Sequence, residues 1–134
     1  MENKDYVLHV NWHSHRVGTL AWVDENFYLT QRKEKELKEA RSEGYDGIPG
    51  FDFKKNRIYQ SRELFDYFLR KTLKKTPVEQ CEDLITLTKT PFTDSFSLSE
   101  VELDEKAMEE FKKRLIKRYN DIQKRAALKE ELAK

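Results

Sequence analysis

Cysteine, glycine and proline are scarce in this chain. Its 134 residues include one cysteine, four glycines and three prolines. The single cysteine, Cys81, excludes an intramolecular disulfide and any zinc site built from several thiolates, and it favours a reducing compartment. Cys81 falls on the apolar side of an amphipathic pattern, which indicates a small buried residue rather than a reactive thiol.

A strong net charge and a long apolar run are also missing. The 26 basic and 25 acidic residues leave a formal net charge of +1, so no overall field attracts nucleic acid or an acidic membrane. No apolar run is long enough to span a bilayer, and the first ten residues, MENKDYVLHV, lack the apolar core of a signal peptide. We therefore expect a cytoplasmic protein that makes no membrane contact.

Aromatic residues, in contrast, are plentiful. They make up 12% of a chain in which 38% of the residues are charged, and the mean hydropathy is −0.91. A disordered chain rarely carries so many aromatic residues, so the composition predicts a compact core with a charged surface. We expect an α+β domain over residues 1–103 and a charged amphipathic helix over residues 104–134.

Three segments near the N-terminus alternate, or are rich in β-branched and aromatic side chains, as strands are. They are residues 6–12, 17–23 and 27–30, with a turn signal at Asp24-Glu25-Asn26 before the third. This pattern predicts a three-stranded antiparallel meander. Short strands near residues 57–60 and 95–98 can extend the sheet, and Gly18 is expected to mark a close backbone approach.

Helical patterns occupy four segments. Residues 31–43 use strong helix formers but offer only Leu37 and Ala40 as apolar anchors, so we expect a short, exposed helix that ends at Gly44. Two core helices should pack against the sheet, one capped by Ser61 and one beginning with Pro77. Their expected core side chains are Leu64, Phe65, Phe68, Leu69 and Leu73, then Val78, Cys81, Leu84 and Ile85. From Asp104 onward, one apolar stripe among charged residues predicts the long C-terminal helix.

All three histidines fall within HVNWHSHRVGTL, residues 9–20. In an unbroken strand His9, His13 and His15 would share a face, where neutral imidazoles can bind zinc or nickel. The second strand can pair with the first only after a turn near residues 13–15, however, and no second ligand cluster completes a tetrahedral site. We expect a hairpin tip with solvent-facing histidines and no metal site.

No catalytic motif is recognisable. The sequence contains no G-x-S-x-G elbow, no phosphate-binding glycine-rich loop and no H-E-x-x-H zinc motif. Carboxylate pairs such as Asp46 with Asp52 are expected by chance in a chain with 25 acidic residues. We therefore expect no catalytic residues, no cofactor and a protein that is not an enzyme.

The segment GYDGIPGFDF, residues 44–53, carries many apolar side chains for a loop. Its glycines permit a turn-rich backbone that directs these side chains toward a partner, and Pro49 limits the freedom lost on binding. An alternative, in which the same side chains cover the open edge of the sheet, is equally compatible with the sequence. An exposed tryptophan would also be a natural anchor. The candidate partner-binding residues are Arg16, Trp22, Tyr45, Ile48, Phe51 and Phe53.

The expected C-terminal helix also concentrates basic side chains. Those that would contact phosphates are Lys112, Lys113, Arg114, Lys117 and Arg118. Acidic residues are interspersed among them and permit many ion pairs between residues four apart. A solvated helix face is therefore favoured over a nucleic-acid site.

The run Arg16-Val17-Gly18-Thr19-Leu20, after the strand YVLHVNW and a tight turn, resembles the opening hairpin of the N-terminal subdomain of HipA-type kinase toxins. The segment Ser61-Arg62-Glu63-Leu64-Phe65-Asp66-Tyr67-Phe68 is similar to a helix of that subdomain in which a Leu-Phe pair packs on the sheet. The resemblance covers roughly residues 5–75, and RVGTL is its most specific part. The turn at His13-Ser14 and the segment Gly47-Ile48-Pro49-Gly50-Phe51 depart from the family pattern.

This resemblance implies a function. In the kinases the subdomain is a small β-rich cap ahead of a catalytic core for which this chain has no room. Stand-alone relatives occur in split bacterial toxin–antitoxin modules, where the small protein binds and restrains a separate kinase. The resemblance therefore implies an antitoxin-like or regulatory subunit whose partner is a HipA-like kinase. Two alternatives stay open: an inhibitor or accessory protein of a phage or plasmid that binds another bacterial protein, and a nucleic-acid-binding protein.

Overall fold

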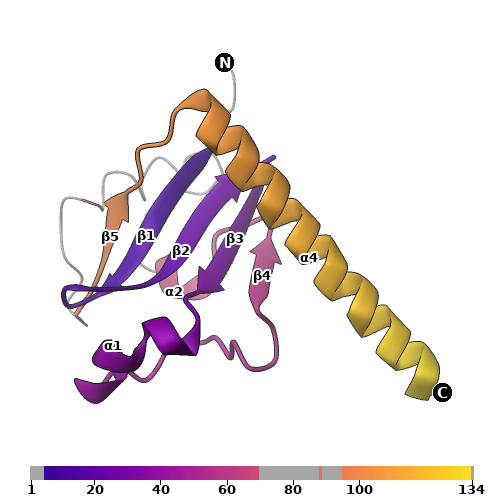
Figure 1. Ribbon diagram of the computed structural model, residues 1–134, viewed down its shortest axis with the longest axis horizontal. Helices are drawn as coiled ribbons and strands as arrows, with labels where there is room; N and C mark the ends of the chain where they lie inside the picture. Colours follow the sequence, from indigo (N-terminus) through magenta and orange to yellow (C-terminus); the bar gives the residue numbers. More distant parts are fainter. Residues whose placement is uncertain (1–4, 70–87, 89–94, 134) are drawn as a thin grey trace. The chain divides into compact units, whose positions relative to one another are not determined.

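The computed structural model describes residues 5–69, 88 and 95–133. The chain divides into two compact units, Met1–Glu102 and Leu103–Lys134, each described by itself. In the first unit the elements are strands β1 (Tyr6–Trp12), β2 (His15–Val23) and β3 (Asn26–Gln31), the 3₁₀ turn η1 (Glu34–Glu36), helix α1 (Lys38–Ser42), strand β4 (Ile58–Ser61), helix α2 (Asp66–Leu69) and strand β5 (Phe96–Glu100). The second unit contains helix α4 (Glu105–Ala133) (Figure 1).

The first unit is built on a five-stranded antiparallel sheet with the strand order β4-β3-β2-β1-β5. The expected meander is its centre, formed by β1, β2 and β3. The short strands expected near residues 57–60 and 95–98 are present as β4 and β5, one at each edge. The α+β class, the antiparallel sheet and the long C-terminal helix are therefore confirmed.

Two tight turns connect the meander. His13 and Ser14 form the first turn, in which His13 has a φ of 53° and its N–H donates to the carbonyl of Ser95 at 2.9 Å. Asp24 and Glu25 form the second turn, with φ values of 49° and 64°. Positive φ at both central residues matches the right-handed twist of the paired strands. The expected hairpin tip near residues 13–15 is confirmed, but the expectation that the three histidines face solvent holds only for His13, because His9 lies within β1 and both His9 and His15 are half-buried.

A β-bulge interrupts the pairing of β1 with β2. Val10 pairs with Gly18, but Asn11 pairs with Arg16, so Val17 is an extra residue on β2. The bulge turns the Val17 side chain into the core, where it is fully buried. As a result Arg16 lies opposite Asn11, on the other face of the sheet.

Gly18 allows β3 to approach β2 closely. A Cβ atom on this residue would lie 2.4 Å from the carbonyl oxygen of Thr30, closer than any side chain tolerates. The expected close approach at Gly18 is therefore confirmed.

One face of the sheet carries the hydrophobic core. The buried side chains of the strands pack there together with Phe68 of α2 and Leu37 beside α1. In Figure 1, α2 lies behind the sheet, and η1 and α1 lie at the end where β2 begins and β3 ends. The core cluster consists of Leu8, Val10, Val17, Leu20, Trp22, Phe27, Leu29, Leu37, Ala40, Tyr45, Ile48, Leu64, Phe68, Phe96 and Leu98.

The opposite face of the sheet is divided into an apolar and a polar half. Val7, Ala21 and Tyr28 are consecutive cross-strand partners in the apolar half, and all three are buried. Toward the first hairpin, the corresponding row is His9, Thr19 and Thr30.

The helices differ from the expectation more than the strands do. Residues 31–43 hold the end of β3, η1 and the five-residue α1 rather than one helix, although Leu37 and Ala40 are buried anchors as expected. Ser61 ends β4 instead of capping a helix, because residues 58–61 continue the pairing with β3. Its Oγ accepts a hydrogen bond from the Glu63 N–H at 3.2 Å, and α2 begins only at Asp66.

The expected pair of core helices is therefore not matched. Phe68 is buried as expected, whereas Phe65 is only half-buried. The segment that begins with Pro77, together with Leu73 and Cys81, lies outside the described residues.

Helix α4 begins where the sequence indicates. The carboxylate of Asp104 accepts a hydrogen bond from the Ala107 N–H at 2.7 Å, which satisfies one of the free donors of the first turn. Among the helices within residues 5–69 and 95–133, none combines the length and apolar character needed to cross a membrane.

Candidate protein-binding surface

The loop that follows α1 starts with a Schellman motif. Gly44 has a φ of 108° and donates to the carbonyl of Arg41, while the Tyr45 N–H donates to the carbonyl of Ala40 at 3.0 Å. In this motif the residue after the glycine folds back toward the helix. Tyr45 accordingly joins the core with Ala40 rather than pointing to solvent.

The Tyr45 side chain is held there by specific contacts. Its hydroxyl donates to Oε1 of Gln31 at 2.6 Å, and the Arg41 guanidinium lies 5.1 Å from the centre of its ring. Burial raises the pKa of the Tyr45 hydroxyl well above its usual value. Tyr45 is thus a neutral structural residue.

Three of the candidate partner-binding side chains are not exposed. Tyr45 is 3% exposed, Ile48 is 2% exposed and Trp22 is 4% exposed. Trp22 packs on Phe27, with the ring centres 4.5 Å apart. The expectation that Tyr45 and Ile48 point outward is wrong, because the Schellman motif and the turns after it fold the start of the loop onto the core.

The end of the same loop behaves differently. Phe51 and Phe53 are half-buried and meet Tyr59 of β4 and Phe65 in a continuous group of rings, which we call the aromatic edge (Phe51, Phe53, Tyr59, Phe65). The ring centre of Phe51 lies 5.0 Å from that of Tyr59 and 5.4 Å from that of Phe65, in edge-to-face geometry. The ring centres of Phe53 and Tyr59 are 5.4 Å apart. All four rings keep part of their surface exposed.

A clamp from β4 fixes this end of the loop. The Tyr59 hydroxyl donates to the carbonyl of Asp52 at 2.8 Å and accepts from the N–H of the same residue at 3.1 Å. The Asp52 carboxylate in turn accepts from the Lys54 N–H at 3.0 Å. Because Asp52 stands between Phe51 and Phe53, the clamp holds both rings in place.

Basic residues lie close to the aromatic edge in sequence. The stretch KKNRIYQSR, residues 54–62, contains four basic residues and no acidic one. These four, Lys54, Lys55, Arg57 and Arg62, are all exposed. Within the described residues none of them forms an ion pair. The stretch therefore adds positive charge beside the fixed aromatic rings, and the exposed Asp52 and Glu63 border it with negative charge.

Arg16 does not belong to this surface. It is exposed on the opposite face of the sheet, where the bulge directs it. The three histidines are separated as well: His9 shares the face of Arg16, His13 lies in the turn, and His15 pairs with Trp12 and contacts the carboxylate of Glu43. Among the described residues, no three side chains of histidine, cysteine, aspartate or glutamate are grouped as metal ligands would be.

Tyr59 and Phe65 are the members of the aromatic edge that the sequence did not single out as binding residues. A usable signal was present for Tyr59. In the pattern Ile58-Tyr59-Gln60 the side chains alternate, so Tyr59 takes the face of its partner Leu29 while Ile58 and Gln60 take the other. No comparable signal distinguishes Phe65 from a fully buried core residue.

Comparison of the chain with protein-family models, with curated proteins and with solved structures found no match.

Proposed function

We propose that this chain is a non-enzymatic protein-binding module, and that the aromatic edge with its flanking basic residues is the surface that contacts the partner. The observation that carries the proposal is the Tyr59 clamp. Half-exposed rings that are already fixed lose little conformational freedom on binding, which is the property of a good interface anchor. A solvated loop would not need this arrangement.

The charge of the surface indicates the chemistry of the partner. The nine residues 54–62 contain four basic side chains, none of which forms an ion pair with another described residue. A partner surface that offers apolar side chains flanked by carboxylates would match both features and would associate faster at low ionic strength.

The resemblance of residues 5–75 to the HipA N-terminal subdomain supports a particular partner. We propose a HipA-type kinase produced as a separate chain, which this protein binds and restrains as an antitoxin-like or regulatory subunit. The RVGTL run occupies β2, where Val17 and Gly18 form the bulge and the close contact with β3. These residues support the fold rather than the contact with a kinase.

A capture experiment tests the proposal. The tagged protein is used to capture partners from its native host, and the captured proteins are identified by mass spectrometry. We expect one HipA-like kinase, whose autophosphorylation falls when the purified protein is added. Another single partner would instead favour the inhibitor or accessory protein of a mobile element.

Three variants assign the surface. Phe51→Ala with Phe53→Ala should weaken capture at least about tenfold, a loss typical of interface anchors. Tyr45→Ala should destabilise the fold, because Tyr45 is buried, and so separates a core effect from an interface effect. Lys129→Ala, an exposed charge change in the second unit, is the control. If the double phenylalanine variant captures the partner normally, the aromatic edge is not the interface.

Nucleic-acid binding through α4 is the second candidate. Lys112, Lys113, Lys117 and Lys124 lie along one side of this helix together with Glu109 and Asp121. The acidic pair on the same side, and the Arg114–Glu110 contact at 3.8 Å, offset part of the charge. Salt-dependent binding to generic duplex DNA that disappears when the lysines are neutralised would support this function.

A further inference from the structure

The polar half of the sheet lies on the face opposite the core. The proposed function assigns no role to its side chains. We call this half the polar platform: His9, Asn11, Arg16, Thr19, Thr30 and Arg32. His9, Thr19 and Thr30 lie side by side on β1, β2 and β3, and Asn11 lies opposite Arg16 on the next row. Side chains stand roughly perpendicular to a sheet, so these polar groups face the same direction.

The Arg32 side chain reaches the backbone of Arg16 on this platform. The Arg32 guanidinium donates to the backbone carbonyl of Arg16 at 3.5 Å, and the backbone N–H of Arg32 donates to the carbonyl of Val17 at 2.8 Å. These contacts bring Arg32, just after β3, to the backbone of the bulge. Burial, and then the positive charge of Arg32, lowers the pKa of Arg16.

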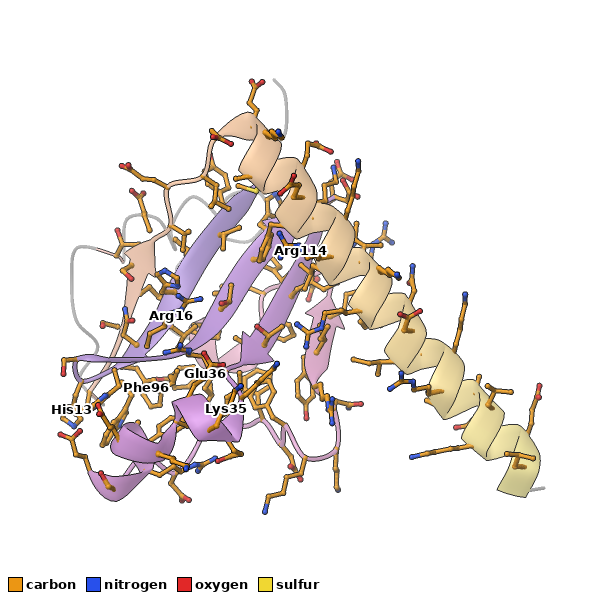
Figure 2. The ribbon with its side chains drawn as sticks, viewed as in Figure 1. His13, Arg16, Lys35, Glu36, Phe96 and Arg114 are labelled. Carbon is orange, nitrogen blue, oxygen red and sulfur yellow. The ribbon has the colours of Figure 1, made fainter. Side chains whose placement is uncertain are left out.

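The negative charge near Arg16 and Arg32 does not balance their positive charge. Glu36 of η1 pairs with Arg32 at 2.5 Å. Arg16 forms no ion pair within the described residues, although it lies close enough to Glu36 to feel its charge. Figure 2 shows Arg16 on β2 and Glu36 on η1 at this end of the sheet. The two guanidinium groups share one carboxylate, and Lys35 also lies close enough to Glu36 to interact with its charge, so positive charge is in excess here.

His9 adds a second unsatisfied group. Its Nδ1 atom is buried and has no hydrogen-bond partner within the described residues. Burial, and then the charges of Arg16 and Arg32, lower the pKa of the imidazole. The ring is therefore harder to protonate than an ordinary histidine, and a bound anion would reverse this effect by favouring the protonated ring.

We infer that the polar platform binds a carboxylate side chain of the protein partner, with Arg16 as the principal contact. The excess positive charge favours a carboxylate, and a guanidinium binds a carboxylate through two parallel hydrogen bonds. The inference rests on the proposed function for the source of the carboxylate. The site itself is separate from the aromatic edge, since the two lie on opposite faces of the sheet.

The test uses the full chain without any partner, so that it does not depend on the aromatic edge. N-acetylated tetraglutamate is titrated into ¹⁵N-labelled protein while the His9 ring resonances are followed by NMR. We expect a saturable shift toward the protonated imidazole. Inorganic phosphate is titrated in parallel as the competing anion.

Three variants sharpen the result. Arg16→Gln should weaken tetraglutamate binding by about tenfold, the loss of one charge-assisted contact. Glu36→Gln should strengthen binding, because it removes the competing carboxylate. Arg57→Gln, a matched change at an exposed arginine of the aromatic surface, should leave the titration unchanged.

Several outcomes would overturn the inference. They are an absent or non-saturable shift of His9, an equal effect of Arg16→Gln and Arg57→Gln, and a response to phosphate without one to tetraglutamate. Loss of kinase capture in the phenylalanine variants with an unchanged tetraglutamate titration would show that the two surfaces act independently. Normal kinase capture by the phenylalanine variants would count against the aromatic edge as the interface and would not bear on the polar platform.

Discussion

Two glycines of this chain are required for different physical reasons. Gly18 has no room for a Cβ atom, because the carbonyl oxygen of Thr30 would lie 2.4 Å from it. Gly44 has room, with the nearest atom 4.0 Å away on Trp12, but its φ of 108° is unfavourable for any other residue. One glycine is therefore fixed by packing and the other by backbone conformation.

This difference predicts the order of two substitutions. Gly18→Ala should lower the free energy of unfolding by about 3 kcal/mol, because β3 must move away from β2. Gly44→Ala should cost only about 1–2 kcal/mol, since strain at one residue is its main effect. Urea denaturation of both variants measures the costs. A Gly18→Ala protein as stable as the parent would mean that the strands are farther apart than the structure places them.

His9 makes stability depend on pH. Its pKa is lowered in the folded protein, first by burial and then by Arg16 and Arg32. The unfolded chain therefore binds the proton more readily, so the free energy of unfolding should fall as the pH drops from about 6.5 through the folded pKa. Above about 6.5 both states hold a neutral imidazole, and His9 contributes no further change.

Urea denaturation at a series of pH values between about 7 and 5 checks this prediction. His9→Gln should flatten the dependence in this window, because glutamine does not titrate there. The same substitution at the exposed His13 is the control and should retain the contribution of His9. An unchanged slope in His9→Gln would place the titrating group elsewhere.

At the scale of elements, the strands could be predicted and the orientation of the loop could not. Alternation in residues 6–12 and the turn residues Asp24 and Glu25 define the meander locally, so sequence pattern was sufficient. The bulge at Val17 is invisible to alternation, because one extra residue changes which face Arg16 takes.

The loop after α1 shows the same limit. Its three glycines and its apolar residues are compatible either with an exposed binding loop or with a loop that covers the core. The Schellman motif directs Tyr45 into the core. In the sequence this motif is indicated by an apolar residue directly after the glycine that ends a helix. Nothing so local marks where the loop changes from buried Ile48 to half-exposed Phe51. That change depends on Tyr59, eight residues further along the chain, which holds Asp52.

The clamp itself can be tested with a conservative change. Tyr59→Phe keeps the ring contacts of the aromatic edge but removes both hydrogen bonds to Asp52, at a cost of about 1 kcal/mol in stability. We expect faster hydrogen exchange of the Asp52, Lys55 and Asn56 amides, since the first donates to Tyr59 and the others donate to the Asp52 carbonyl. The amides paired between β1 and β2 serve as the control. Unchanged exchange at Asp52 would show that the loop is ordered without the clamp.

At the scale of the whole molecule, the net charge of +1 hides local differences. Four basic residues that form no ion pair with any described residue flank the aromatic edge in sequence, the polar platform carries excess positive charge, and α4 alternates both signs. A chain of this kind has little long-range attraction for polyanions, but it can recognise a partner through separate short-range charged sites. Partner choice is then set by the spacing of carboxylates on the partner rather than by its overall charge.

The division of the chain into two units leads to a final prediction. Every residue of the core cluster lies between positions 8 and 98, in the unit Met1–Glu102. A fragment of residues 1–102 should therefore unfold cooperatively in urea, with a dependence of about 1–3 kcal/mol per molar denaturant, as expected for a small domain. A peptide of residues 103–134 should be partly helical by circular dichroism, because it keeps the Asp104 cap and is long enough to sustain a helix. If the fragment shows no cooperative transition while the full chain does, the core cluster cannot hold the sheet by itself, and residues 103–134 are needed for the fold.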